Sequence, residues 1–323
     1  MRGTAAVAIG VAGCGHFGRF HALKVAEAAD ARLAGVCDPD AARAAAVGSD
    51  ANARVLAWPD LLDASEAVII AAPVAEHFRL AQSALRAGRH VLVEKPIAAT
   101  PAEADVLANL ATRTGCVLQV GHLERFSAAF QALAALKPRP LYIEAIRAAP
   151  FKLRGTDVSV VLDLMIHDLD LVLTMLDCPI TRIEAVGVPL ASAHADMASA
   201  RLCFANGSTA SLTASRIAER TERRMRLFER GRSIALDFSS RSLSVIARSA
   251  EGAPLAGAPD FRLLESRWEE HDSLAAEHAA FRAAIRGQAP VVVDAAAGTR
   301  ALAAALGIAE AISTDSSGFV PAA

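Results

Sequence analysis

The sequence lacks several features that mark particular classes of protein. Its five cysteines, at positions 14, 37, 116, 178 and 203, are odd in number and widely spaced, which fits neither a disulfide framework nor a metal-ligand pattern. With 33 Lys and Arg against 35 Asp and Glu, its net charge of −2 predicts no general attraction to nucleic acid or membrane. No run reaches the roughly 18 apolar residues that span a bilayer. We therefore expect a cytoplasmic protein with reduced thiols.

A glycine-rich turn near the N-terminus has the spacing of a dinucleotide-binding motif. An apolar run over 7–12 precedes Gly13, Gly15 and Gly18, and 16–29 has the composition of a helix. In such a motif the three glycines allow a tight turn, close approach of the backbone to a pyrophosphate, and close packing of helix on strand. The helix N-terminus offers its N–H groups to the phosphates. A glycine-rich turn without a ligand is the alternative interpretation.

Asp38 indicates which dinucleotide to expect. It lies twenty residues beyond Gly18, at the end of the apolar run 33–37. A carboxylate at this place accepts hydrogen bonds from the adenosine ribose and repels a 2′-phosphate. Arg43 is the one nearby group that could accommodate that phosphate, although a solvated helix position also explains it. The sequence thus predicts NAD rather than NADP.

Short apolar runs alternate with helical patterns through the first 121 residues. The expected strands cover 7–12, 32–37, 67–72, 91–93 and 117–120. Segments between them, such as 76–87 and 101–114, repeat apolar residues at helical spacing. This alternation predicts an α/β domain with a doubly wound parallel sheet of the Rossmann type.

Beyond residue 121 the pattern changes to strands in direct succession. After a long helical pattern over 157–176, strand-like stretches cover 183–188, 198–204, 208–214, 225–229, 233–238 and 243–248. Asn206-Gly207 is a strong hairpin signal between two of them. We expect an NAD-binding domain over 1–121 and an α+β domain with a large, mostly antiparallel sheet over 122–293. A final helix over 294–313 is expected to pack back on the first domain.

Two sets of ionisable residues fall where reacting groups are expected. Lys95 follows the apolar run 90–93 at the carboxyl end of a parallel strand, where it can stabilise a developing alkoxide. Asp163 and His167 are four residues apart on the predicted helix and so share one face. His167 is suited to act as a general base, with Asp163 orienting it or the substrate. A solvated helix face is the alternative.

These motifs together resemble the Gfo/Idh/MocA family of NAD(P)-dependent sugar and polyol oxidoreductases. The resemblance rests on VAGCGHFGRFHA near the N-terminus, the EKP motif at 94–96 and the DxxxHDxD pattern at 163–170, and it runs across the whole chain. It implies that Lys95, Asp163 and His167 form the catalytic group. It also implies an often cis peptide before the proline of EKP, and a homo-oligomer, dimer or tetramer, formed through the open face of the antiparallel sheet.

Narrower strings suggest a branch of this family. VGHLERF at 120–126 and DVSVVLDLMIHDLD at 157–170 are similar to members that oxidise the 3-hydroxyl of UDP-N-acetylglucosamine. That reaction supplies a 3-keto sugar for a transaminase, on the way to the 3-amino sugars of some lipid A. Met165 departs from the glycine of many members without affecting the reacting groups. A nucleotide sugar also requires a pyrophosphate site, for which arginine forks are best suited.

The expected ligand-binding residues therefore form two sets. Those expected at the cofactor are Gly13, Gly15, His16, Phe17, Gly18, Asp38, Pro73, His77, Glu94 and Lys95. Those expected at the sugar or nucleotide-sugar substrate are Arg125, Arg147, Arg154, Asp163 and His167. A second arginine cluster over 216–226 is more simply a solvated face or an oligomer contact. No metal is expected, because lysine and histidine would supply the acid–base chemistry.

Two other functions stay open at this point. In the first, the enzyme oxidises a free polyol or sugar, such as an inositol or glucose, and the arginines are irrelevant. In the second, a noncatalytic nucleotide-binding or redox-sensing protein has kept the fold. The three intact residues of the catalytic group weigh against the second alternative. The leading expectation is an NAD-dependent dehydrogenase acting on CH–OH groups.

Overall fold

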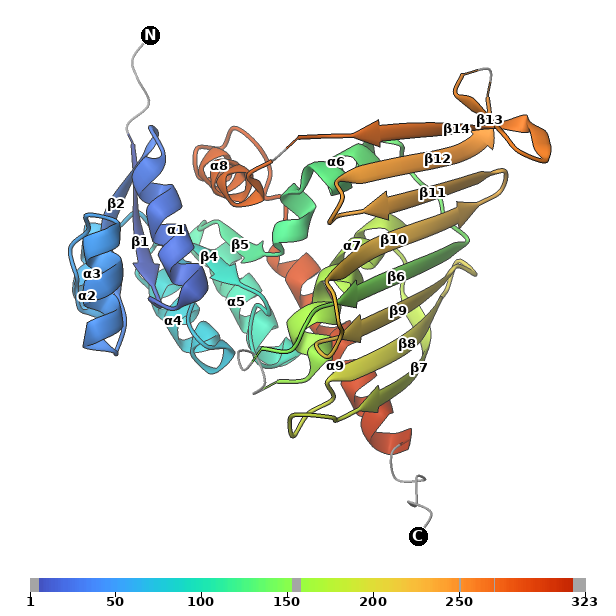
Figure 1. Cartoon of the computed structure of the whole chain (residues 1–323). Coiled ribbons are helices and arrows are strands. Elements are labelled where there is room, and N and C mark those ends of the chain that lie inside the picture. Colours follow the sequence, from blue (N-terminus) through green and yellow to red (C-terminus); the bar gives the residue numbers. More distant parts are fainter. Residues whose placement is uncertain (1–5, 153–157, 250, 270, 316–323) are drawn as a thin grey trace. The chain divides into compact units, whose positions relative to one another are not determined.

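The computed structural model describes residues 6–152, 158–249, 251–269 and 271–315 (Figure 1). The described chain forms two compact units. The first contains the described residues up to Phe126 together with Asp272–Leu302, and the second contains those from Ser127 to His271 and from Ala303 onward. Each unit is described by itself below.

The first unit is built on a parallel five-stranded sheet with the order β2-β1-β3-β4-β5 (Figure 1). Its strands are β1 (Val7–Ala12), β2 (Ala31–Cys37), β3 (Ala67–Ile70), β4 (His90–Glu94) and β5 (Leu118–Gly121). Its helices are α1 (His16–Glu27), α2 (Ala41–Asp50), α3 (Trp58–Ala64), α4 (Val74–Arg86), α5 (Pro101–Thr114), the 3-10 turn η1 (Leu123–Phe126) and α8 (Ser273–Ile285). The predicted Rossmann sheet is confirmed.

Continuous apolar runs form these strands because helices cover both faces of the sheet. All six residues of β1 and all four of β3 are buried. The flanking helices begin at polar signals: the Thr100 hydroxyl accepts a hydrogen bond from the Glu103 N–H, and the Glu103 carboxylate accepts one from the Thr100 N–H, so α5 starts with a capping box. Apolar runs and helix caps are local in the sequence, which explains why this sheet could be predicted.

Helix α8 belongs to the first unit, although it falls within the range expected for the second domain. Arg282 and Arg286 both form ion pairs with Asp30, at 2.8 and 2.7 Å. Phe281 is fully buried in the core cluster that includes residues of β1 and α1. These partners are separated by about 250 positions in the chain, which no local pattern reveals. The first unit extends to Phe126, beyond the boundary expected at residue 121.

Helix α9 (Ala295–Asp315) begins in the first unit and ends in the second. By length and composition alone it could cross a bilayer, with a mean hydropathy of 1.3 over Ala295–Ser313. However, Ala301, Leu302 and Ile308 are almost completely buried, as in a core helix of a folded protein. The first part of this helix, up to Leu302, is grouped with the first unit, and the part from Ala303 onward is grouped with the second.

The second unit is built on a nine-stranded sheet with the order β13-β14-β12-β11-β10-β6-β9-β8-β7. Its strands are β6 (Tyr142–Ala148), β7 (Ile180–Val188), β8 (Met197–Phe204), β9 (Thr209–Ser215), β10 (Glu222–Glu229), β11 (Arg232–Asp237), β12 (Ser242–Arg248), β13 (Ala253–Leu255) and β14 (Ala258–Arg267). Only β6 and β9 pair in parallel among the described strands. The mostly antiparallel sheet is thus confirmed.

Helices cover one face of this sheet (Figure 1). Helix α6 (Ala128–Ala135) packs on β11 and β12, and α7 (Ile166–Leu176) packs on β6 and β9. Strand β6 was not predicted, although it alternates strictly between buried and half-buried residues. Its place beside β9 matters because it carries Arg147.

Candidate functional site

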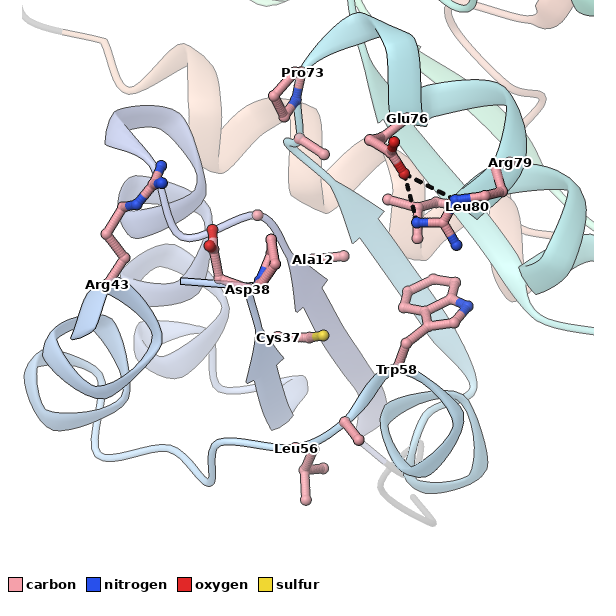
Figure 2. A pocket seen from close by; sticks show the side chains of 14 residues that line it. Ala12, Cys37, Asp38, Arg43, Leu56, Trp58, Pro73, Glu76, Arg79 and Leu80 are labelled. Carbon is pink, nitrogen blue, oxygen red and sulfur yellow. Dashed lines mark hydrogen bonds and ion pairs between the residues drawn. The ribbon is translucent and has the colours of Figure 1, made fainter. Parts of the chain in front are cut away.

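A cavity of about 650 Å³ lies in the first unit at the carboxyl ends of β1, β2 and β3 (Figure 2). Gly13, Asp38 and Pro73 line it from the loops that follow these three strands, and Trp58 and Leu80 add apolar surface. Strand order reverses between β1 and β3, and open α/β sheets bind ligands at such a point. Three residues expected at the cofactor are therefore brought together at one cavity.

The glycine turn has the geometry that a pyrophosphate requires. Gly13 has a φ of +92°, which favours glycine, and a Cβ there would lie 2.5 Å from the Ala71 carbonyl oxygen. A Cβ on Gly15 would meet no atom of the described chain within 4 Å. Gly15 is also the N-cap of α1, where the described residues provide no side-chain cap and no acidic group in the first turn. The helix N-terminus is thus suited to an anion.

Gly18 and Gly15 should respond differently to the same substitution. In Gly18→Ala the new Cβ would lie 1.7 Å from the Gly13 carbonyl oxygen, so we expect a loss of about 2–4 kcal/mol in unfolding free energy. Gly15→Ala should retain its stability but bind NAD⁺ at least about tenfold more weakly, because the methyl group enters the space left for phosphate. Urea denaturation and calorimetric NAD⁺ titration of both variants test this contrast. Equal stability of the two variants would contradict it.

Asp38 is held firmly at the end of β2. Its two carboxylate oxygens accept hydrogen bonds from the Cys14 N–H at 2.7 Å and the Asp40 N–H at 2.8 Å. Burial and the nearby Asp38 carboxylate raise the pKa of the Cys14 thiol to about 12, so this thiol stays neutral. Arg43 is among the residues that line the cavity (Figure 2). Its Nε donates to the Asp40 carboxylate at 2.8 Å, and its side chain is largely exposed. This exposure agrees with the expectation that Arg43 is a solvated helix residue.

Lys95 directly follows β4, and its peptide bond to Pro96 is cis, as the family resemblance implies. His77 connects this loop to the one after β3: its Nδ1 lies 2.8 Å from the Pro96 carbonyl oxygen and its Nε2 lies 2.8 Å from that of Ala72. Burial lowers the pKa of His77. His77 was expected to contact the cofactor, but with both ring nitrogens facing backbone carbonyls it is better described as a positioning residue.

Glu94 belongs to a buried polar network that the sequence reasoning missed. Its carboxylate accepts hydrogen bonds from His21 Nε2 at 3.0 Å and from the Lys95 N–H at 3.2 Å. His21 Nδ1 lies 2.8 Å from Nε2 of His278 on α8. Burial tends to raise the pKa of Glu94, but His21 and Lys95 together hold it below its usual value. The adjacent Glu277 is fully buried, and its pKa is raised well above the usual value by burial and by Glu94.

His16 and Phe17, also expected at the cofactor, lie in the first turn of α1 with exposed side chains. Phe20 is partly exposed beside them, and the His16 ring meets both phenyl rings edge-on, with centroids 5.7 and 4.9 Å away. This small aromatic group stands next to the glycine turn, and His16 and Phe17 remain proposed cofactor contacts.

In the second unit, Asp163 and His167 lie at the start of the expected long helix. The described part begins with a π-turn, η2 (Val161–Met165), which continues directly into α7. The Asp163 N–H donates to the Ser159 carbonyl oxygen at 3.1 Å, and both site residues are half-buried. Single π-turns within helices are frequent at functional sites. The sequence pattern predicted a regular helix here and did not reveal this irregular turn.

The three arginines expected at the substrate do not lie in one element or one unit of the fold. Arg147 on β6 forms a two-pronged ion pair with Asp168 of α7, with distances of 3.0 and 2.8 Å, and both side chains are about 5% exposed. The Arg147 fork thus joins the sheet to α7 as a partner of Asp168, and this pairing does not support the expected pyrophosphate contact. Arg125 is buried in η1 of the first unit, and Arg154 lies outside the described residues.

Comparisons with known proteins agree with this architecture. Residues 7–122 match the model of the oxidoreductase family with an NAD-binding Rossmann fold, and residues 143–233 match the GFO/IDH/MocA C-terminal domain. UDP-N-acetylglucosamine 3-dehydrogenase of Acidithiobacillus ferrooxidans is 42% identical over 94% of this chain and 96% of its own. A solved structure of the enzyme of that name from the same species has a TM-score of 0.91 at 40% identity, covering 96% of this chain and 98% of that one.

A more distant relative, scyllo-inositol 2-dehydrogenase (NAD(+)) of Bacillus subtilis, is 27% identical over 88% of each chain. The nearly full-length match at 42% identity, the two successive domain models and the dinucleotide cavity lead to one assignment. The chain belongs to the Gfo/Idh/MocA family of oxidoreductases, with an NAD-binding Rossmann domain followed by the family's C-terminal domain.

Proposed function

We propose that this protein is an NAD-dependent dehydrogenase that oxidises the 3-hydroxyl of UDP-N-acetylglucosamine to a ketone. The observation that carries the proposal is 42% identity over nearly the full length to an enzyme named for that reaction. The cavity at the glycine turn supports it, because it suits a dinucleotide. The 3-keto product would serve a later transamination in the synthesis of lipid A-type amino sugars.

The residues have separate roles in this proposal. NAD⁺, when bound at the glycine turn, would accept the hydride from the sugar carbon. His167 removes the proton from the sugar hydroxyl, and Asp163 orients His167 or the substrate. Lys95 donates a hydrogen bond to the same oxygen and stabilises the negative charge that develops on it. Arg125 and Arg154 remain the proposed partners of the substrate pyrophosphate.

The preference for NAD over NADP is proposed from the position of Asp38. Its carboxylate is fixed by two backbone N–H groups, and Arg43, the potential phosphate ligand, is paired with Asp40. We expect NAD⁺ to bind about 100-fold more tightly than NADP⁺, a difference of roughly 2.7 kcal/mol. Asp38→Asn should narrow this ratio by removing the negative charge that repels the 2′-phosphate. Tighter binding of NADP⁺ to the unaltered protein would overturn the preference.

Steady-state kinetics with several substrates tests the sugar assignment. We expect kcat/KM for UDP-N-acetylglucosamine to exceed that for free N-acetylglucosamine, glucose, scyllo-inositol and myo-inositol by at least about 10³-fold, because the free sugars lack the nucleotide and its binding energy. A free polyol is the second candidate, favoured by the similarity to the Bacillus subtilis scyllo-inositol enzyme. Faster turnover of an inositol than of the nucleotide sugar would establish that alternative instead.

The protein is further proposed to be a cytoplasmic homo-oligomer that associates through the open face of its large sheet. Val186 on β7 and Phe228 on β10 are exposed large apolar residues on strands of that sheet. Light scattering of the purified chain tests the association: a dimer or tetramer is expected, and a stable monomer at micromolar concentration would contradict it.

A further inference from the structure

A compact group of potential metal ligands is buried within the first unit, apart from the dinucleotide cavity. It consists of His21 on α1 with Glu277 and His278 on α8. One ligand atom from each of the three lies within 4.8 Å of the other two, and none of the side chains is more than 1% exposed. None of the three lines the dinucleotide cavity.

The hydrogen bonds of His21 orient it as a metal-binding histidine. Its Nε2 lies 3.0 Å from the Glu94 carboxylate, so the ring donates a proton there and keeps Nδ1 as the nitrogen with a lone pair. Metal-ligating histidines characteristically donate their second N–H to a carboxylate, which fixes the ring and its tautomer. This Nδ1 accepts a hydrogen bond from His278 Nε2 at 2.8 Å, and an ion bound between the two nitrogens would replace the proton of that bond.

The carboxylate of Glu277 gives a second, independent indication of a bound ion. Both of its carboxylate oxygens are buried and have no hydrogen-bond partner among the residues that the structure describes. Nδ1 of His278 is also without a partner there. A buried polar group without a partner is costly, and native proteins usually satisfy such groups with protein, water or an ion. Glu277 and His278 therefore have buried polar atoms that could bind an ion.

We propose that His21, His278 and Glu277 bind one divalent first-row transition-metal ion, such as Zn²⁺, in the interior of the first unit. Two imidazole nitrogens and one carboxylate are a ligand set that zinc uses elsewhere. Ligands about 2.0–2.1 Å from a tetrahedral ion are roughly 3.4 Å apart, so the two rings need to separate by only about half an ångström. With Glu94 behind His21, the two carboxylates would balance the charge of the ion.

We assign this site a structural role because its ligands do not line the dinucleotide cavity, and a water molecule would complete the tetrahedron around the ion. It would crosslink the helix that follows the glycine turn to α8, two helices that the chain places more than 240 residues apart. Because the ligands are buried, the ion would be taken up as the unit folds. This proposal departs from the metal-free protein expected from the sequence. It is independent of which sugar the enzyme oxidises.

The test measures metal binding directly on the full-length chain with any affinity tag removed. Metal content after purification without chelator is determined by mass spectrometry. The protein is then unfolded in urea with chelator, dialysed, and refolded at increasing concentrations of Co²⁺ while its visible absorption is followed. We expect about one ion per chain and the absorption bands of Co²⁺ with nitrogen and oxygen ligands. Removal of the ion should lower the melting temperature of the protein.

Variants locate the site. Glu277→Gln, which preserves shape, and His278→Gln should each abolish stoichiometric binding, whereas His194→Gln, at an exposed position in the second unit, should bind as the unaltered protein does. Less than about 0.1 ion per chain together with no saturable Co²⁺ binding in the unaltered protein would overturn the proposal, whatever the variants do. Co²⁺ bands that persist in Glu277→Gln and His278→Gln would also overturn it. Sugar turnover plays no part in either readout.

Discussion

Replacing His167 by asparagine is expected to lower kcat about 10³-fold and to leave the affinity for NAD⁺ unchanged. The imidazole is proposed to take the proton of the sugar hydroxyl, and a positioned general base contributes roughly 10²–10⁴-fold to a rate. His167 lies in the second unit at the start of α7, whereas the dinucleotide cavity lies in the first. Single-turnover NADH formation, with NAD⁺ binding measured separately, tests this expectation.

Lys95→Met should cause a loss of similar size, because it removes the proposed hydrogen bond to the developing alkoxide. The double variant should lose far less than the product of the two single effects, since groups that act on one transition state are not additive. His194→Gln is the matched control at an exposed histidine and should keep full activity. Normal turnover in His167→Asn or Lys95→Met, with NAD⁺ bound normally, would remove that residue from the catalytic group.

Replacing Asp168 by asparagine is expected to destabilise the protein by about 3–5 kcal/mol. Arg147 and Asp168 form two hydrogen bonds while nearly excluded from water, and the Arg147 guanidinium also lies 5.9 Å from the centre of the Phe238 ring. Removing the Asp168 carboxylate takes its ion-pair partner away from a buried guanidinium, and breaking a buried pair in this way costs far more than the net contribution of the pair. Urea denaturation of Asp168→Asn measures the loss.

The double variant Arg147→Met/Asp168→Leu should recover most of that stability, because it buries no isolated charge. A surface pair in the same unit provides the control: Arg182 and Glu184 are 3.0 Å apart with more than half of each side chain exposed, so Arg182→Met should cost less than about 1 kcal/mol. If Asp168→Asn cost no more than the surface variant, the pair would not be a structural element. Arg147 would then return as a candidate substrate ligand.

The parts of the fold that could be predicted from the sequence are those determined by local patterns. β1 and the glycine turn follow from an apolar run and three glycines, and α5 follows from Thr100, Pro101 and Glu103. The same holds for Asp38, whose place at a strand end directs it to the cavity. In each case the physical cause lies within a few residues of the feature.

The parts that could not be predicted depend on partners distant in the chain. The contact between His21 and His278 joins positions 257 apart, and no spacing rule links them. The role of Arg147 depends on β6 lying next to β9 and beneath α7, which only the assembled sheet defines. The polar pair Glu277-His278 among the alanines of α8 was a usable signal, because buried ionisable groups require partners.

The central claim, hydride transfer from carbon 3 of a nucleotide sugar, is tested most directly by isotope labelling. The enzyme is incubated with NAD⁺ and UDP-N-acetylglucosamine that carries deuterium at C3, with hydroxylamine present to trap the ketone and draw the reaction forward. Mass spectrometry should then find the deuterium in the reduced cofactor, together with a slower rate than for the unlabelled sugar. Reduced cofactor without deuterium, or no reduction at all, would contradict the claim.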